Sequence, residues 1–208
     1  MLKHIASLYG GQVKIEMVKS TGYQTVKWVI NDSKRIRNII IPLFISFPPL
    51  TTRVQLQLAF VIKTLAGMTM EEYFNARELK YSTRSLLTPL YIIPPYFGDW
   101  LSGFIEAEGS FAIRSGLLGF SFSIGQLHDR YLMEFILEFF NQSKLTIQHK
   151  INSKSPIYFI EIASLKGVTA VVQHLLNYPL QGHKYYQLAV IMKESKALSH
   201  LRYKFWAS

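Results

Sequence analysis

The chain has 208 residues, enough to bury a substantial core, and its 49% hydrophobic and 17% charged content excludes a disordered protein. Its 23 Lys and Arg exceed its 13 Asp and Glu by 10, which indicates a polyanionic partner, with nucleic acid as the first candidate. The sequence has no cysteine, so it excludes a disulfide framework, a thiolate zinc site and a cysteine nucleophile.

The first elements in chain order form a predicted hairpin. Residues 12–17 alternate polar and apolar side chains, and residues 25–30 supply the partner strand with Lys27 on its polar side. This period of two is typical of an antiparallel sheet covered on one face only. We therefore expect a buried apolar face and a polar face that is open to a partner.

The longest apolar run, at 39–50, does not predict a membrane span. It contains Pro42, Pro48 and Pro49, whereas a spanning helix needs about 20 apolar residues. The first residues, Met-Leu-Lys-His, lack the features of a signal peptide and of a transit peptide. We expect no membrane partner and no import signal.

A linker is predicted next, because Thr88-Pro89 and Pro94-Pro95 interrupt any helix between residues 82 and 97. Residues 1–90 hold 12 Lys and Arg against 5 Asp and Glu, and residues 91–208 hold 11 against 8. We expect two domains, 1–90 and 91–208, of which the first is the more basic.

The second domain begins with a predicted helix at 100–107, with Asp99 as its N-cap and Gly109 as its stop. Four strands with one apolar face are predicted after it, at 110–115, 119–126, 145–151 and 157–162. The apolar-periodic residues 133–140 lie between the second and third strands and read as a helix.

An internal repeat links the two domains. Pro49-Leu50 recurs 130 residues later as Pro179-Leu180, and residues 57–59, Gln-Leu-Ala, recur at 187–189. Both parts follow the order helix, strand, strand, helix, Pro-Leu, helix. The segment 100–131 precedes the second copy and has no counterpart before the first.

The most informative run is 101–111, Leu-Ser-Gly-Phe-Ile-Glu-Ala-Glu-Gly-Ser-Phe. Its small residues Ser102, Gly103 and Ala107 allow another helix to approach closely. Glu106 and Glu108 lie near the C-terminus of the predicted helix, where the macrodipole disfavours negative charge. Either a divalent cation compensates them or they are ordinary solvated residues.

This run resembles the signature of the LAGLIDADG homing endonucleases, with Leu101, Gly103, Ile105, Ala107 and Gly109 in place. The resemblance implies an α+β fold of duplicated αββαββα units, with saddle-shaped antiparallel sheets along the DNA major groove. This sequence departs from that pattern, because its first repeat is truncated at the N-terminus. The resemblance also implies Mg²⁺-dependent cleavage of double-stranded DNA by an intron-encoded enzyme, and two motif helices packed at a pseudo-twofold axis through Ser102, Gly103 and Ala107.

By the same resemblance, Glu108 is the catalytic metal ligand and Lys184 the basic residue at the scissile phosphate. Arg53 lies one position from the residue that matches Lys184 in the first repeat. The sequence holds one motif where two-repeat members have two. We expect an upstream extension of the reading frame, a truncated protein, or a homodimer that pairs through the motif helix.

The polar strand faces supply the predicted nucleic-acid contacts. These are Gln12, Lys14, Lys27, Arg114, Ser121, Ser123, Gln148 and Lys150. Two functions stay open: a site-specific DNA endonuclease, or a non-catalytic RNA-binding protein such as a maturase for a group I intron or an architectural binder of structured RNA. The family's usual habitat places the protein in the mitochondrion.

Overall fold

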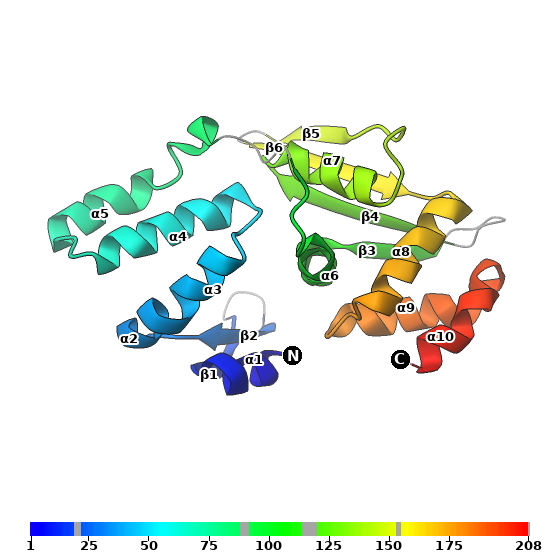
Figure 1. Ribbon diagram of the computed structural model, residues 1–208, viewed down its shortest axis with the longest axis horizontal. Helices are drawn as coiled ribbons and strands as arrows, with labels where there is room; N and C mark the ends of the chain where they lie inside the picture. The colour runs from blue at the N-terminus through cyan, green and yellow to red at the C-terminus, as the bar shows by residue number, and fades with distance from the viewer. Residues whose placement is uncertain (19–21, 88–91, 114–119, 153–154, 208) are drawn as a thin grey trace. The chain divides into compact units, whose positions relative to one another are not determined.

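The computed structural model describes residues 1–18, 22–87, 92–113, 120–152 and 155–207. The chain divides into two compact units, Met1–Leu87 and Thr88–Ser208 (Figure 1). The sequence places this boundary at residue 90. No helix in the described ranges is both long enough and apolar enough to cross a membrane.

The first unit is a hairpin with helices before and after it. Its elements are α1 (Leu2–Tyr9), β1 (Gln12–Met17), β2 (Gln24–Val29), α2 (Ser33–Arg35), a π-helical segment (Ile36–Ile40), α3 (Ile41–Ser46), α4 (Thr52–Leu65), α5 (Met70–Leu79) and a 3₁₀ turn (Arg84–Leu86). Gly10 and Gly11, with φ of 74° and 89°, turn the chain from α1 into β1. β1 has the predicted bounds, and β2 begins one residue before its predicted start.

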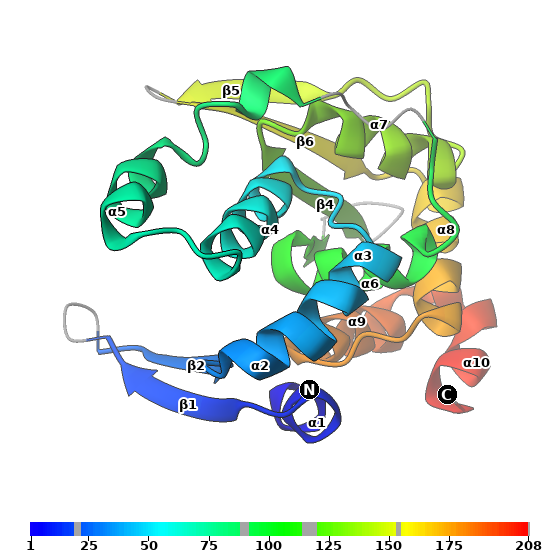
Figure 2. The same cartoon turned by 60° about the vertical axis from the view of Figure 1, so that its left-hand side comes forward.

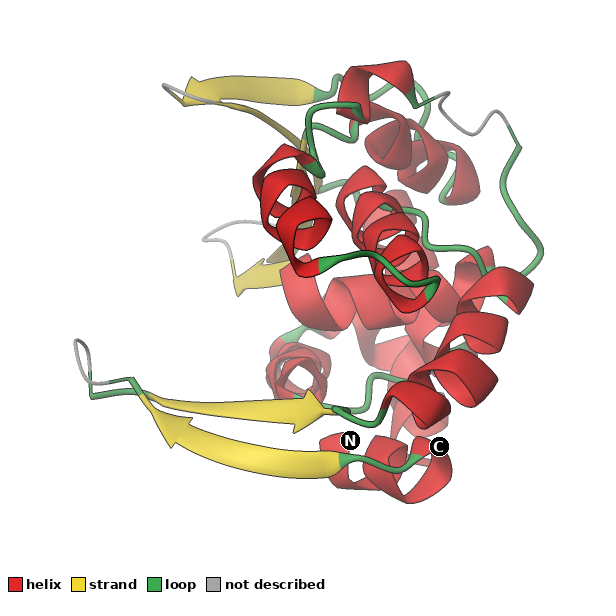
Figure 3. Ribbon diagram, turned by 90° about the vertical axis from the view of Figure 1, so that its left-hand side faces the viewer, coloured by secondary structure: helices red, strands yellow, loops and turns green. Residues whose placement is uncertain are grey.

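The β1–β2 hairpin has an exposed apolar face, contrary to the prediction of a covered one. Its antiparallel register pairs Ile15 with Val26, and Ile15, Met17 and Val26 are 67%, 64% and 51% exposed. Figures 2 and 3 show the strands extending away from α1 and α2. The alternation set the strand and its two faces correctly, but burial requires a helix over the face as well.

The second unit is larger and contains the long sheet. Its elements are α6 (Phe97–Glu108), β3 (Ser110–Ile113), β4 (Phe120–Leu127), α7 (Arg130–Phe139), β5 (Gln148–Asn152), β6 (Ser155–Ile162), α8 (Leu165–Asn177), α9 (His183–Glu194), a 3₁₀ segment (Lys196–Leu201) and α10 (Arg202–Ala207). The four antiparallel strands are ordered β3-β4-β6-β5.

One face of this sheet is covered by helices α6, α7 and α8. Phe122 and Ile124 on β4 and Ile160 on β6 are buried there, with Leu101 and Ile105 of α6. Such burial of branched and aromatic side chains is the main source of stability for the unit. The opposite face holds the polar positions of the strands.

One predicted strand needs correction, and two others reach into residues outside the described part of the chain. The strand expected at 145–151 begins only at Gln148. Before it, the chain turns at residues 143 and 144, where the N–H of Leu145 donates to the carbonyl of Gln142 at 2.9 Å. Residues 114–119 lie outside the described part of the chain, so the ends of the strands expected at 110–115 and 119–126 cannot be compared there.

The order of elements repeats in the two units. The first unit runs α1, β1, β2, α2 to α3, Pro49-Leu50 and α4, and the second runs α7, β5, β6, α8, Pro179-Leu180 and α9. The segment from α6 to β4 precedes this series in the second unit only. The α+β architecture with a four-stranded sheet in one unit and a two-stranded sheet in the other follows from this difference.

Candidate active site

Helix α6, which contains the motif 101–109, buries the apolar side chains of one side and exposes a narrow strip of small residues on the other. It begins at Phe97, three residues before its predicted start, so Asp99 lies in its first turn and is not the N-cap. Leu101 and Ile105 are fully buried, whereas Gly103 and Ala107, one turn apart, are exposed. A Cβ atom at Gly103 would meet nothing within 4 Å.

Ser102 does not belong to that exposed side, which corrects its predicted role in packing against a second motif helix. Its side chain is buried and donates to the carbonyl of Tyr178 at 2.8 Å, and its Oγ lies 3.0 Å from Nε2 of His174. Ser102 therefore joins α6 to α8 and to the residue after it. A serine has one hydroxyl proton, so Nε2 of His174 must be the donor in the second contact.

Glu108 is the last residue of α6, and its side chain is exposed. None of the described residues forms a hydrogen bond or an ion pair with its carboxylate. No group of three or more His, Asp or Glu able to hold a metal ion occurs within the described ranges. The free carboxylate still suits Mg²⁺, which binds proteins through one or two carboxylates together with substrate phosphates.

Glu106 occupies a different environment two residues earlier. Its Oε2 accepts from the N–H of Gly182 at 3.2 Å, and its Oε1 accepts from the N–H of Lys184 at 3.1 Å. These N–H groups lie at the start of α9. Glu106 is therefore neither of the two predicted kinds of acid, solvated or compensated by a cation: backbone N–H groups of α9 bind its carboxylate.

Lys184 is the second residue of α9, and its side chain is half-buried. No acid among the described residues pairs with its ammonium group. Arg53 is likewise the second residue of α4. The sequence matches at an offset of 130 still place Arg53 opposite His183, so the two basic residues stay one position apart in the repeat alignment.

The predicted nucleic-acid contacts of the second unit lie on the open face of its sheet, with two exceptions. Gln148 and Lys150 are exposed on β5, and Nζ of Lys150 lies 5.4 Å from the ring centre of Phe159. Ser123 is half-buried on β4. Ser121, predicted to be open, is 2% exposed and donates to Glu161 at 3.1 Å, and Arg114 lies outside the described residues.

The predicted contacts of the first unit share one face of the hairpin. The register pairs Gln12 with Val29 and Lys14 with Lys27, and all three predicted residues are exposed. Lys27 donates to Glu16 at 2.5 Å. This hydrogen bond, followed by the charge of Lys27, lowers the pKa of the Glu16 carboxyl below its usual value.

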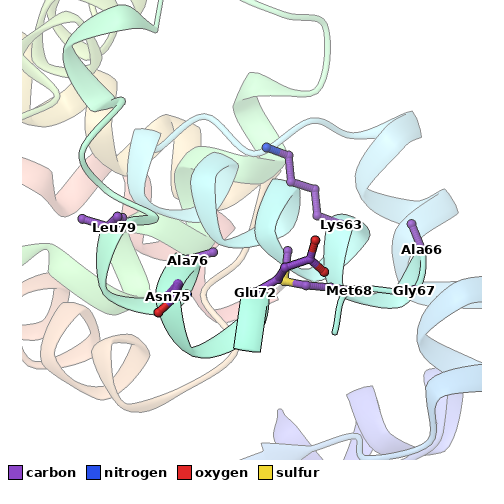
Figure 4. Close-up of a pocket in the computed structure, with 8 residues that line it drawn as sticks. All are labelled: Lys63, Ala66, Gly67, Met68, Glu72, Asn75, Ala76 and Leu79. Atoms are coloured by element: carbon purple, nitrogen blue, oxygen red, sulfur yellow. The ribbon is translucent and has the colours of Figure 1, made fainter. Parts of the chain in front are cut away.

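A hollow in the first unit lies where α4 turns into α5 (Figure 4). It is lined by Lys63, Ala66, Gly67, Met68, Glu72, Asn75, Ala76 and Leu79. Glu72 already accepts from the backbone and side chain of Thr69 in a capping box. None of the predicted site residues lines this hollow.

Similarity to known proteins decides the family. A model of the family described as LAGLIDADG endonuclease matches residues 101–194. A probable intron-encoded endonuclease aI3 of Dictyostelium citrinum is 36% identical over 186 residues, which cover 88% of this chain and 74% of that protein. The chain belongs to the LAGLIDADG endonuclease family. The Dictyostelium discoideum protein of the same name is 30% identical and is covered to 75% of its length, against 88% of this chain.

Solved structures show the LAGLIDADG fold. The LAGLIDADG meganuclease I-CpaMI bound to uncleaved DNA matches with a TM-score of 0.70 over 98% of this chain and 78% of that one, at 18% identity. The homing endonuclease I-SmaMI bound to cleaved DNA matches with a TM-score of 0.66 over 98% and 80%, at 19% identity. The predicted α+β fold of this LAGLIDADG chain is confirmed.

Sequence reasoning missed Glu106 in this LAGLIDADG chain, although a weak signal was present. The helix α9 follows Gly182, and no Ser, Thr, Asp or Asn stands at its start to cap it. A helix start without a local cap requires a partner from elsewhere when it is packed against the protein. The identity of that partner could be found only from the fold, because Glu106 lies 76 residues before Gly182.

Proposed function

We propose that this chain is a site-specific homing endonuclease that cuts double-stranded DNA with Mg²⁺. The observation that supports the proposal is the pairing of α6 and α9. Helix α6 ends in the exposed carboxylate of Glu108, and the second residue of α9 is Lys184, whose ammonium group has no acidic partner in the described structure. The two helices pack against each other. An acid and a base on contacting helices suit a reaction at a phosphodiester.

The residues have separate roles in the proposed reaction. Glu108 would hold Mg²⁺, and the bound ion would supply a more acidic water and neutralise charge on the phosphate oxygens. Lys184 would stabilise the charge that develops on the scissile phosphate, where its ammonium acts most strongly in the transition state. Ser102 and the buried Leu101 and Ile105 anchor α6, the helix that ends at Glu108.

The polar strand positions are the proposed DNA contacts. They are the exposed Gln12, Lys14, Lys27, Gln148 and Lys150 and the half-buried Ser123. Arg114 is added to the set on the basis of the sequence alone. Phosphate contacts of this kind make binding strongly dependent on salt. Ser121 is left out of the set, because its hydroxyl is buried and donates to Glu161.

The test uses a supercoiled plasmid that carries the uninterrupted host gene, with Mg²⁺, with EDTA and with Ca²⁺. We expect cleavage at one site with Mg²⁺ only, and Glu108→Gln should abolish it while DNA affinity stays within about twofold. Glu138→Gln is the matched control, because Glu138 is an exposed acid on α7. Equal cleavage by parent and Glu108→Gln would remove Glu108 from the site.

A second function is supported by the single motif in the sequence. One Glu108 supplies half of the carboxylates that a two-metal site uses, whereas the basic surface would serve RNA as well. A group I intron maturase or another binder of structured RNA is the alternative, and synthesis in a mitochondrion fits both. Promotion of intron splicing, with no DNA cleavage in any divalent cation, would favour it.

A further inference from the structure

The start of α9 is capped from another helix. Its N-cap residue is Gly182, which has no side chain, and no local side chain accepts from the first N–H groups of the helix. The carboxylate of Glu106, on α6, fills that place by accepting from the N–H groups of Gly182 and Lys184. Figure 1 shows the two helices, green and orange, in the second unit.

The N-terminus of α9 offsets the unfavourable interaction between the charge of Glu106 and the C-terminal end of α6. The macrodipole of α6 disfavours Glu106, whereas the positive end of α9 and its free N–H groups favour it. Gly182 is required for the approach, since a Cβ atom there would lie 2.4 Å from Oε1 of Glu106. Its φ of −134° is available to any residue, so the carboxylate is what excludes a side chain.

The capped residue is Lys184 itself. One carboxylate thus joins the main chain of Lys184 to the last turn of α6, two residues before Glu108. A lysine side chain has several rotatable bonds, so the position of its Cα limits where the ammonium group can reach. A shift of about 1 Å in a group at a reacting centre costs about a hundredfold in rate.

We propose that Glu106 is a positioning residue for DNA cleavage: it fixes Lys184, at the start of α9, relative to Glu108 at the end of α6. The inference rests on the proposed nuclease function and adds a residue to it. Glu106 acts through Lys184 and touches no substrate.

The test is single-turnover cleavage at saturating protein, with DNA affinity measured separately. Glu106→Ala should slow cleavage at least tenfold and leave affinity within about twofold. Glu106→Gln should recover part of the rate, because its amide oxygen can still accept one N–H. Gly182→Ala should slow cleavage with Glu106 intact, because its methyl group displaces the carboxylate, and this variant serves if Glu106→Ala does not fold.

A double-mutant cycle separates positioning from general destabilisation. In a Lys184→Met background, Glu106→Ala should have no further effect on the rate, because the residue through which it acts is gone. Ser164→Ala is the matched control: Ser164 caps α8 by accepting from the N–H of Gly167 at 3.2 Å, in the same unit. It should lower the melting temperature without slowing cleavage by folded protein.

The outcomes distinguish this inference from the proposed function. A parent protein that binds DNA and cuts in no divalent cation overturns the nuclease and the positioning role together. An active parent, slowed by Lys184→Met, with Glu106→Ala cutting at the parental rate overturns the positioning role alone. An equal loss from Glu106→Ala in the parent and in Lys184→Met also overturns it, because the residue would then act by stability only.

Discussion

Lys184 is the residue on which charge stabilisation in the proposed reaction depends. Lys184→Met should lower single-turnover cleavage about a hundredfold while DNA affinity changes little, because negative charge develops at the phosphate mainly in the transition state. The measurement is the cleavage rate at saturating protein, set beside a binding curve.

Lys166→Met is the matched control for this change. Lys166 is the second residue of α8, as Lys184 is of α9, and it is exposed. It should cut at the parental rate. A Lys184→Met protein that matches this control would place Lys184 outside the site.

Glu16 limits the basic character of the hairpin, because it accepts a hydrogen bond from Lys27. Glu16→Gln should raise DNA affinity several-fold at low salt and steepen the dependence of log K on log salt by about one, since Lys27 then becomes available for a phosphate. Equilibrium binding between low and moderate salt measures both quantities.

Glu71→Gln, an exposed site on α5, removes the same charge away from the hairpin. If Glu71→Gln raises DNA affinity by the same factor, the effect of Glu16→Gln comes from net charge alone. The contact between Glu16 and Lys27 would then have no part in DNA binding.

For single residues, the sequence predicted the chemical type and the strand face of a side chain, but it could not predict the hydrogen-bond partners of that side chain. The period of two placed Lys14 and Lys27 on one face correctly. The sequence could not show that the carboxylate of Glu106 is hydrogen-bonded and that of Glu108 is exposed. The two N–H groups that bind Glu106 come from a helix far along the chain. The prediction that Ser121 is exposed was wrong for the same reason. Its burial depends on residues distant in the sequence, about which the alternation of polar and apolar residues gives no information.

The contact between α6 and α8 contains a buried titratable group. His174 is 5% exposed and lies against the rings of Phe139, Phe140 and Tyr178. Burial lowers its pKa to about 4, partly opposed by the charge of Asp99. Because Nε2 donates to Ser102, the added proton would sit on Nδ1, which has no hydrogen-bond partner among the described atoms.

This lowered pKa predicts a loss of stability in acid. Between pH 6.5 and 4 the unfolded chain binds a proton at His174 that the folded chain does not, so the free energy of unfolding falls as the pH falls through this window. The full effect is about 3 kcal/mol. His174→Phe should flatten this part of the profile, which denaturant unfolding at several pH values measures.

His149→Phe, at an exposed position on β5, is the control for this substitution and should keep the parental profile. Parallel profiles for the parent and His174→Phe would show that His174 does not carry the acid sensitivity.

The sequence predicted which helices and strands form better than it predicted their first and last residues and their capping residues. β1 has its predicted bounds, because its alternation is unbroken and Gly10 and Gly11 precede it. Residues 145–147 continue the alternation but lie outside the strand: the pairing of β5 with β6 begins at Gln148, and the N–H of Leu145 donates to Gln142. Asp99 has the right chemistry for an N-cap, yet α6 starts earlier, at Phe97, whose side chain is buried.

In the whole molecule, burial is concentrated in the second unit. Among the described residues of the first unit, the buried hydrophobic side chains are Leu50 and Leu56, whereas the second unit buries side chains from its helices and its sheet alike. The repeat in the sequence predicted the shared order of elements. It could not predict this inequality, which arises because the four-stranded sheet has helices over one face and the two-stranded hairpin leaves its apolar side chains exposed.

A double-strand cut by this protein should require two copies of the chain. The sequence contains one motif, so one chain brings one Glu108, whereas cations that contact both the attacking and the leaving oxygen need carboxylates from two sides. Gly103 and Ala107 leave room for a second helix to approach α6 beside Glu108. We expect this 208-residue chain to nick the plasmid or leave it intact at low concentration, and to linearise it as a homodimer forms.

Sedimentation measures the fraction of homodimer, and the cleavage assay measures the fraction of plasmid that is linearised, across the same series of protein concentrations. Gly103→Leu should prevent linearisation, because its side chain fills the space that a partner helix needs while meeting no atom of its own chain near its Cβ. Ser143→Leu adds the same side chain at an exposed turn and should cut like the parent. Efficient linearisation by a species that sediments as a monomer would contradict the prediction, because a single Glu108 would then suffice for both strands.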